Sequence, residues 1–178
     1  MTRRFNFALP AFLALALFCP SSGSLAAQTG TLPDGPAAGA SVDRFIYEDA
    51  GITAVSFRYS RLRARQVGTE IGVSLFPAAL SAGSLYLAPD LGAALSIPGS
   101  GFSGLLKAGV SALTGLGGGF AFQPGYHFGG GMIVQTGKRS GVRLDVVRHY
   151  YLIDSETEGM WSVGLGFTAL AGRSKPTP

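Results

Sequence analysis

Two segments near the end of the chain alternate apolar and polar side chains residue by residue. The first is Gly-Val-Arg-Leu-Asp-Val at 141–146, and the second is Trp-Ser-Val-Gly-Leu-Gly-Phe at 161–167. A period of two residues is typical of a β-strand, because successive side chains point to opposite faces of a sheet. The alternation therefore predicts strands that have one apolar face and one polar face.

Further segments of this kind fill the middle of the chain. Together with the two above, they are 53–62, 68–76, 84–97, 103–113, 125–135, 141–152 and 159–170. Each is near or above the length of about nine to eleven residues that a tilted strand needs to cross a bilayer. Bacterial single-chain barrels have an even number of strands, so we expect an eighth at 41–48. The predicted fold is all-β, an eight-stranded antiparallel up-and-down transmembrane β-barrel.

The connections between these segments differ in length. Tight turns are expected at 98–101 and 137–140, where Gly, Ser and Pro gather. Outer-membrane barrels have short periplasmic turns and longer outer loops. We therefore expect the tight turns on the periplasmic side, and any specificity in outer loops at 77–83, 114–124 and 153–159.

The phase of the charged residues favours a membrane barrel over a soluble barrel or sandwich with an apolar interior. One register of the strands is almost uniformly apolar, and the opposite register carries the charges and the histidines. We expect this second set to line the lumen, with three carboxylates and three fixed cations that balance one another. The expected lumen residues are Arg58, Glu70, Asp90, Lys107, His127, Arg143, Asp145 and His149.

Aromatic residues in the apolar register provide a separate indication. Two aromatic girdles at the membrane interfaces are typical of these barrels, and the expected members are Tyr59, Tyr126, Phe128, Tyr150, Trp161 and Phe167. Arg148 shares the lipid-facing register. A cation costs about 2 to 4 kcal/mol at the midplane but about 0 to 1 kcal/mol near an interface, so we expect Arg148 near the outer interface, against lipid phosphates.

The N-terminus has the features of a cleaved secretory signal peptide. Arg3 and Arg4 precede an apolar run at 5–18, and Ser24 and Ala26 suit cleavage after Ala26. The run is too short for an uncleaved membrane anchor. The predicted organisation is a signal peptide at 1–26, a flexible lead-in at 27–40, a barrel at 41–170 and a C-terminal tail at 171–178.

Cleavage would also change the chemistry of the chain. The single cysteine, Cys19, would be removed, which excludes disulfides from the mature protein. Loss of Arg3 and Arg4 would lower the formal net charge from +4 to +2. A nucleic acid partner therefore has no support in the charge.

The leader, the segment at 141–146 that runs into a polar loop, and the final strand at 161–167 together resemble the small bacterial outer-membrane β-barrel families, of the outer membrane protein A transmembrane-domain kind. The resemblance covers about residues 41–170. It implies a monomer in the outer membrane, in contact with lipid and lipopolysaccharide. It also implies that the last strand, with Gly164 and Phe167, is a signal for the barrel assembly machinery. This chain departs from the pattern because it continues beyond Ala171.

No set of residues in the sequence matches the catalytic residues of an enzyme. A lipid A deacylase has a serine two positions after its histidine, but positions 129 and 151 are Gly and Tyr, and a lipid A palmitoyltransferase matches equally poorly. A new arrangement of His149 with Asp145 and a loop serine such as Ser155 is open, although four residues of strand separate Asp145 and His149 by about 13 Å. Both histidines are better explained as interior polar residues.

No cofactor or metal is expected. The histidines and acids lack the spacing of metal ligands, and the glycine runs at 115–119 and 129–131 lack the context of a phosphate loop. The sequence predicts an integral protein of the Gram-negative outer membrane with a structural, adhesive or permeability-related role and a plugged, porin-like barrel that does not conduct freely. An outer-membrane enzyme acting on lipid and a soluble periplasmic ligand-binding barrel are the alternatives.

Overall fold

Eight strands form one closed antiparallel barrel, in which neighbours along the chain pair and β8 pairs with β1. The computed structural model describes residues 35–171 except 64, 81–82, 118–119 and 138. The strands are β1 (Gly35–Tyr47), β2 (Ala50–Arg63), β3 (Gln66–Leu75), β4 (Leu85–Pro98), β5 (Phe102–Leu116), β6 (Phe120–Gly137), β7 (Ser140–Ile153) and β8 (Glu156–Leu170). The predicted eight-stranded up-and-down barrel is confirmed.

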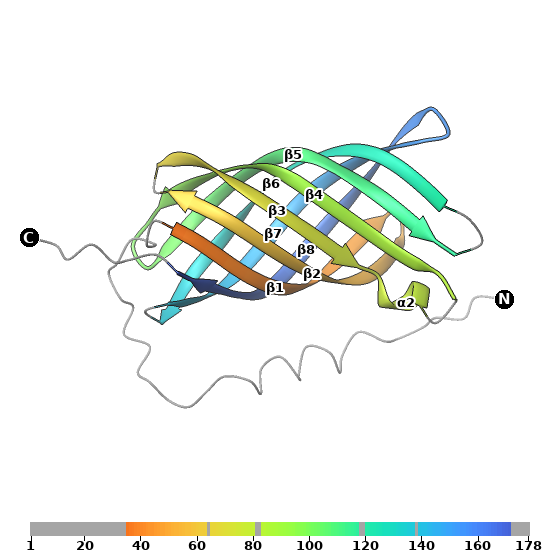
Figure 1. Cartoon of the computed structure of the whole chain (residues 1–178). Helices are drawn as coiled ribbons and strands as arrows, with labels where there is room; N and C mark the ends of the chain where they lie inside the picture. Colours follow the sequence, from red (N-terminus) through yellow and green to blue (C-terminus); the bar gives the residue numbers. More distant parts are fainter. Residues whose placement is uncertain (1–34, 64, 81–82, 118–119, 138, 172–178) are drawn as a thin grey trace, which may run out of the picture.

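One short helix, α2 (Pro77–Leu80), lies between β3 and β4. Among the described residues, none of the helical structure is both long and apolar enough to span a membrane. The helix marks one end of the barrel, which we call the helix end. β1 begins and β8 finishes at the opposite end, the termini end (Figure 1). The turns at the termini end are short, at 64–65, 99–101 and 138–139.

β1 begins at Gly35 and not near residue 41, so the predicted end of the lead-in is wrong. Residues 37–40 pair with β2 on one side and with β8 on the other, from Ala37 opposite Leu170 onwards. The segment 35–40 contains only Gly, Pro and Ala, and these side chains give no alternation to detect. The segment is a strand because its backbone pairs with the free edges of both β2 and β8. The signal peptide and the remaining lead-in and tail lie outside the described residues.

Two of the three predicted outer loops are also wrong. β5 and β6 extend so far that only 117–119 separates them, and only Asp154 and Ser155 separate β7 from β8. Both of these turn residues have positive φ, 48° and 72°, as in the tight hairpin turn that matches strand twist. Polar and small residues at 114–124 and 153–159 suggested loops, but a strand tolerates such residues where it extends beyond the apolar part of the membrane. The link at 76–84 is the longer connection.

Side chains alternate between the lumen and the exterior along the strands. On β2, Phe57 and Tyr59 are 48 % and 51 % exposed, whereas Arg58 between them is 9 % exposed. On β7, Leu144 and Val146 are exposed and Asp145 is buried. The exterior is therefore a continuous apolar surface, much larger than the patches that soluble monomers expose.

Three layers of side chains fill the lumen along its axis. An apolar layer at the termini end, the termini-end cluster, consists of Ala37, Leu62, Ala94, Leu105, Ile133 and Leu170. Charged and hydroxyl side chains occupy the middle. A second apolar layer at the helix end, the helix-end cluster, consists of Phe45, Ala54, Phe76 and Ala88. The two apolar layers were not predicted from the sequence, although their strand residues share the inward register with the charges.

Candidate functional site

Six charged side chains meet in the middle of the lumen and form one ion-pair network. They come from five strands and are at most 7 % exposed in their side chains. We call this group the lumen network, and its members are Asp43, Arg58, Glu70, Lys107, Arg143 and Asp145. Charges taken out of water are tolerated when they are paired and hydrogen-bonded, and each of these has such partners.

Two cations bridge the same two carboxylates at the centre of the lumen network. Nη2 of Arg143 lies 2.6 Å from Oε2 of Glu70, and its Nε lies 2.7 Å from Oδ2 of Asp145. Nζ of Lys107 lies 3.2 Å from Oε1 of Glu70 and 2.8 Å from Oδ1 of Asp145. Glu70 is on β3 and Arg143 is on β7, four strands apart around the barrel. The network therefore ties opposite walls together.

Arg58 joins β1 and β2 to this centre. Its Nη2 lies 2.8 Å from Oδ2 of Asp43, and its Nη1 lies 3.8 Å from Oδ2 of Asp145. Hydroxyl groups supply the remaining hydrogen bonds: Ser56 donates to Asp43 and Ser60 donates to Glu70, each over 2.7 Å. Each of these oxygens also accepts from an arginine, Oδ2 of Asp43 from Arg58 and Oε2 of Glu70 from Arg143, so the serines are second donors.

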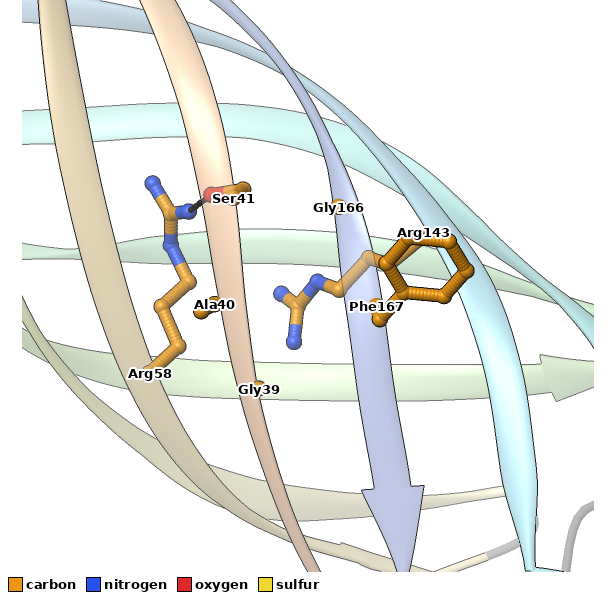
Figure 2. A pocket seen from close by; sticks show the side chains of 7 residues that line it. All are labelled: Gly39, Ala40, Ser41, Arg58, Arg143, Gly166 and Phe167. Carbon is orange, nitrogen blue, oxygen red and sulfur yellow. Dashed lines mark hydrogen bonds between the residues drawn. The ribbon is translucent and has the colours of Figure 1, made fainter. Parts of the chain in front are cut away.

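Little free space is left beside the lumen network. A cavity of about 10 Å³ lies next to Arg58 and Arg143, where Arg58 donates to Oγ of Ser41 over 2.9 Å (Figure 2). That volume corresponds to about one water molecule. Glycines on the opposing strands make room for the carboxylates, since a Cβ at Gly164 or Gly131 would collide with Asp43 or Asp145.

All eight residues predicted for the lumen lie in the inward register, but their grouping differs from the expectation. Asp43 was missed, and it takes the place expected for Asp90 in the ion pairs, so the lumen network has three cations and three carboxylates and Asp90 is a fourth inward carboxylate. Asp90 is half-buried above Gly72 of β3, and it takes part in none of the ion pairs described above. Alternation does not single out Asp43, because each register of 42–47 has one charge: Arg44 shares a face with Val42, and Asp43 shares a face with Phe45.

The two histidines lie side by side in a polar layer between the lumen network and the helix-end cluster. Their ring centroids are 5.7 Å apart, and Nε2 of His149 lies 3.0 Å from Oγ of Ser162 on β8. Ser155 lies in the β7–β8 turn and Asp145 is held by Lys107 and Arg143, so the arrangement of these two with His149 that the sequence left open does not form. The contact with Ser162 could be predicted only from the register between β7 and β8, which the sequence does not specify.

The contact between His149 and Ser162 lacks two features of a hydrolytic pair. A serine nucleophile needs a base that a third group orients, but Nδ1 of His149 has no hydrogen-bond partner within the described part of the chain. Both side chains are also buried, so a lipid substrate could not reach them. The described residues contain no grouping of three or more potential metal ligands.

Four of the six aromatic residues predicted for the girdle lie together on the outside of β6, β7 and β8, whereas Tyr59 is on the outside of β2 and Phe167 is nearer the termini end of β8. Tyr150 stacks on Tyr126 at a centroid distance of 5.0 Å and on Phe128 at 5.8 Å. The guanidinium of Arg148 lies 5.4 Å from the ring of Tyr150 and 5.2 Å from that of Trp161. This distance allows cation–π attraction. Arg148 thus faces outward within an aromatic surface, as its register predicted.

Solved structures with the same architecture include small bacterial outer-membrane barrels and a designed transmembrane barrel. OprG of Pseudomonas aeruginosa matches with a TM-score of 0.56 and 12 % identity over 80 % of this chain and 98 % of its own. The N-terminal β-barrel domain of OprF from the same organism gives 0.54 and 13 % over 78 % and 99 %. This chain has the fold of the small outer-membrane β-barrels.

A third example of this fold is Neisserial surface protein A, with a TM-score of 0.51 and 12 % identity over 76 % of this chain and 95 % of that protein. No protein-family model matches the sequence, and no curated protein matches it either. At these identities the comparisons show a shared fold alone.

Proposed function

We propose that this protein is an integral outer-membrane barrel with a structural role, and that its lumen is closed to ions and solutes. The exterior supports a place in the membrane. Large apolar side chains such as Phe57, Val110 and Trp161 are about half exposed there, and burial in lipid would stabilise such a surface by about 25 cal/mol per Å². A soluble periplasmic barrel would leave this surface in water.

The proposal of a closed lumen rests on the lumen network. Its ion pairs cross the lumen from β3 to β7 and leave a cavity of about 10 Å³ beside them. Apolar layers lie on both sides of it, and hydrophobic constrictions resist the passage of ions because water leaves them. An ion would have to cross three barriers in series.

The orientation in the membrane follows from the connections. We propose that the termini end faces the periplasm and the helix end faces outward, because periplasmic turns are the short ones in these barrels. Three outer connections, at 48–49, 117–119 and 154–155, are as short as the periplasmic turns, so the difference between the two ends rests on the longer link at 76–84, which includes α2. An adhesive role, which depends on long loops, therefore has less support than a structural role.

Conductance across planar bilayers tests the closed lumen. Purified protein that migrates differently on a gel before and after boiling is folded, and we expect it to give no steady single-channel current. Large, steady current steps from such a preparation would contradict the proposal. Cell fractionation tests the location separately, since recovery as soluble periplasmic protein would exclude the membrane barrel.

A further inference from the structure

A cup with apolar walls opens at the helix end of the barrel, above the helix-end cluster. Its volume is about 340 Å³, within the range of about 300 to 1,000 Å³ that is usual for ligand pockets. β1, β2, β4, β5, β8, α2 and Phe76 contribute the lining, and all of the lining side chains are aliphatic, aromatic or thioether groups. We call this space the apolar cup.

Two phenylalanines close the floor of the apolar cup. Phe45 and Phe76 are 3 % and 7 % exposed, and their rings meet edge to face with centroids 5.0 Å apart. Leu113 and Met160 pack against them. The ring of His149 lies 5.3 Å from that of Phe45, so the floor separates the cup from the polar layer of the lumen.

Tyrosine rings are held in place at the rim. The hydroxyl of Tyr47 donates to Oε2 of Glu158 over 2.9 Å, which fixes the ring as a wall and satisfies its polar end. The ring of Tyr86 lies over Gly115 of β5, where an added Cβ would come within 2.8 Å of Cε1. Walls of this kind exist before a ligand arrives, which lowers the entropic cost of binding.

The position and the lining of the apolar cup define what it can hold. The strand residues that line it belong to the inward register, so the barrel wall separates the cup from lipid and its opening faces the aqueous mouth. No charged side chain lines it, and a charged ligand would lose its hydration without a partner. The volume is more than twice that of an apolar cavity of about 150 Å³ that binds benzene, so a single small ring fits with room to spare.

We propose that the apolar cup binds a small uncharged apolar molecule from the aqueous side, of the size of a monocyclic aromatic compound. This inference goes beyond the structural role proposed above. It needs only one of the three layers of the closed lumen, the helix-end cluster that forms the floor, and toluene binding is measured separately from conductance. Lipid acyl chains are a poorer fit, since lipid meets only the outer face of the wall.

The methionines provide a built-in measurement. Of the three in the chain, Met160 lines the apolar cup and Met132 lies on the exterior of β6, 37 % exposed. Toluene would be titrated into protein in lipid nanodiscs, with the ¹³C-labelled methionine methyl groups followed by NMR. We expect the Met160 resonance to shift and saturate, whereas Met132 responds only in proportion to the toluene dissolved in lipid. Equal, unsaturated responses at both methyl groups would overturn the proposal.

Matched variants and a charged analogue complete the test. Ala79→Trp fills the apolar cup and should abolish the saturable shift of Met160, whereas Ala93→Trp on the exposed outer face of β4 should preserve it. In the unaltered protein, benzoate should bind at least about tenfold more weakly than toluene, because it carries a charge. Comparable binding of both compounds, or a saturable shift that persists in folded Ala79→Trp, would overturn the proposal. The comparison of toluene with benzoate decides the question if Ala79→Trp does not fold.

Discussion

At the scale of single residues, the lumen network is a set of charges that depend on one another. Arg143 contacts both Glu70 and Asp145 with hydrogen-bond geometry, and it is 5 % exposed. Removing one partner of a buried pair is costly because the remaining charge has neither water nor a counter-ion. Arginine also binds two carboxylates through a planar fork, which lysine cannot reproduce.

We therefore expect Arg143→Met to lower the free energy of unfolding by about 3 to 5 kcal/mol, and Arg143→Lys to lower it by less. Arg139→Met is the matched control. Arg139 is exposed in the β6–β7 turn, and its replacement should change stability by no more than about 0.5 kcal/mol. Urea unfolding followed by the fluorescence of Trp161, the single tryptophan, measures both. Equal effects of the two Met variants would show that the network does not stabilise the barrel.

The outward-facing Arg148 makes a second prediction at this scale. If it lies near the outer interface, Arg148→Leu should change the free energy of unfolding by less than about 1 kcal/mol, since a cation costs little there and its aromatic contacts contribute about 0.5 to 1 kcal/mol. Val146→Arg, on the same exposed face of β7 and at its middle, should destabilise the barrel by about 2 to 4 kcal/mol. The same unfolding assay distinguishes these values. Stabilisation of about 2 kcal/mol or more by Arg148→Leu would place Arg148 near the midplane.

At the scale of elements, β1 shows how pairing determines a strand whose side chains give no pattern. The backbone of residues 37–40 pairs on both sides, and inward-facing Gly39 leaves no room for a Cβ against the carbonyl of Phe167. The small residues of this segment allow β2 and β8 to approach β1 closely. These are contacts between strands, which the sequence alone does not show.

Deletion of residues 35–40 should therefore prevent barrel closure. We expect this variant to lose the difference in gel migration before and after boiling, because β2 and β8 would each be unpaired where residues 37–40 now lie, and only 41–47 of β1 would remain to close the barrel. Deletion of 29–34, a segment of equal length in the predicted lead-in, should preserve the difference. A barrel that stays heat-modifiable without residues 35–40 would contradict the role of β1.

At the scale of the whole molecule, the sequence predicted the strand count, the inward register and the apolar exterior, because all three follow from alternation along each strand. Layering along the axis was not predicted, since it depends on how far each strand is shifted against the next. Leu105 and Lys107 share a register on β5, yet one belongs to an apolar layer and the other to the lumen network. The outer loops were mistaken because polar composition alone does not distinguish a loop from a strand in water.

The layered lumen predicts how conductance should respond to mutation. Lys107→Ala alone should leave the barrel without steady current, because the termini-end cluster still closes the lumen. A combined variant with Lys107→Ala, Leu105→Ala, Ile133→Ala and Phe45→Ala removes side chains from all three layers and should conduct measurably, provided that it stays heat-modifiable. Planar bilayer recordings compare the two. Steady current from Lys107→Ala alone would show that the apolar layer is not a barrier.

The pairing of β1 with β8 has a kinetic consequence. Every other strand pair is a hairpin between neighbours, and its residues meet with little loss of chain entropy. Ala37 and Leu170 come from opposite ends of the barrel sequence, so their meeting carries the largest loop-closure cost and, among two-state proteins, such long-range contacts accompany slow folding. We therefore expect the pairing of β1 with β8 to be the slow step of assembly, after the seven hairpins have formed.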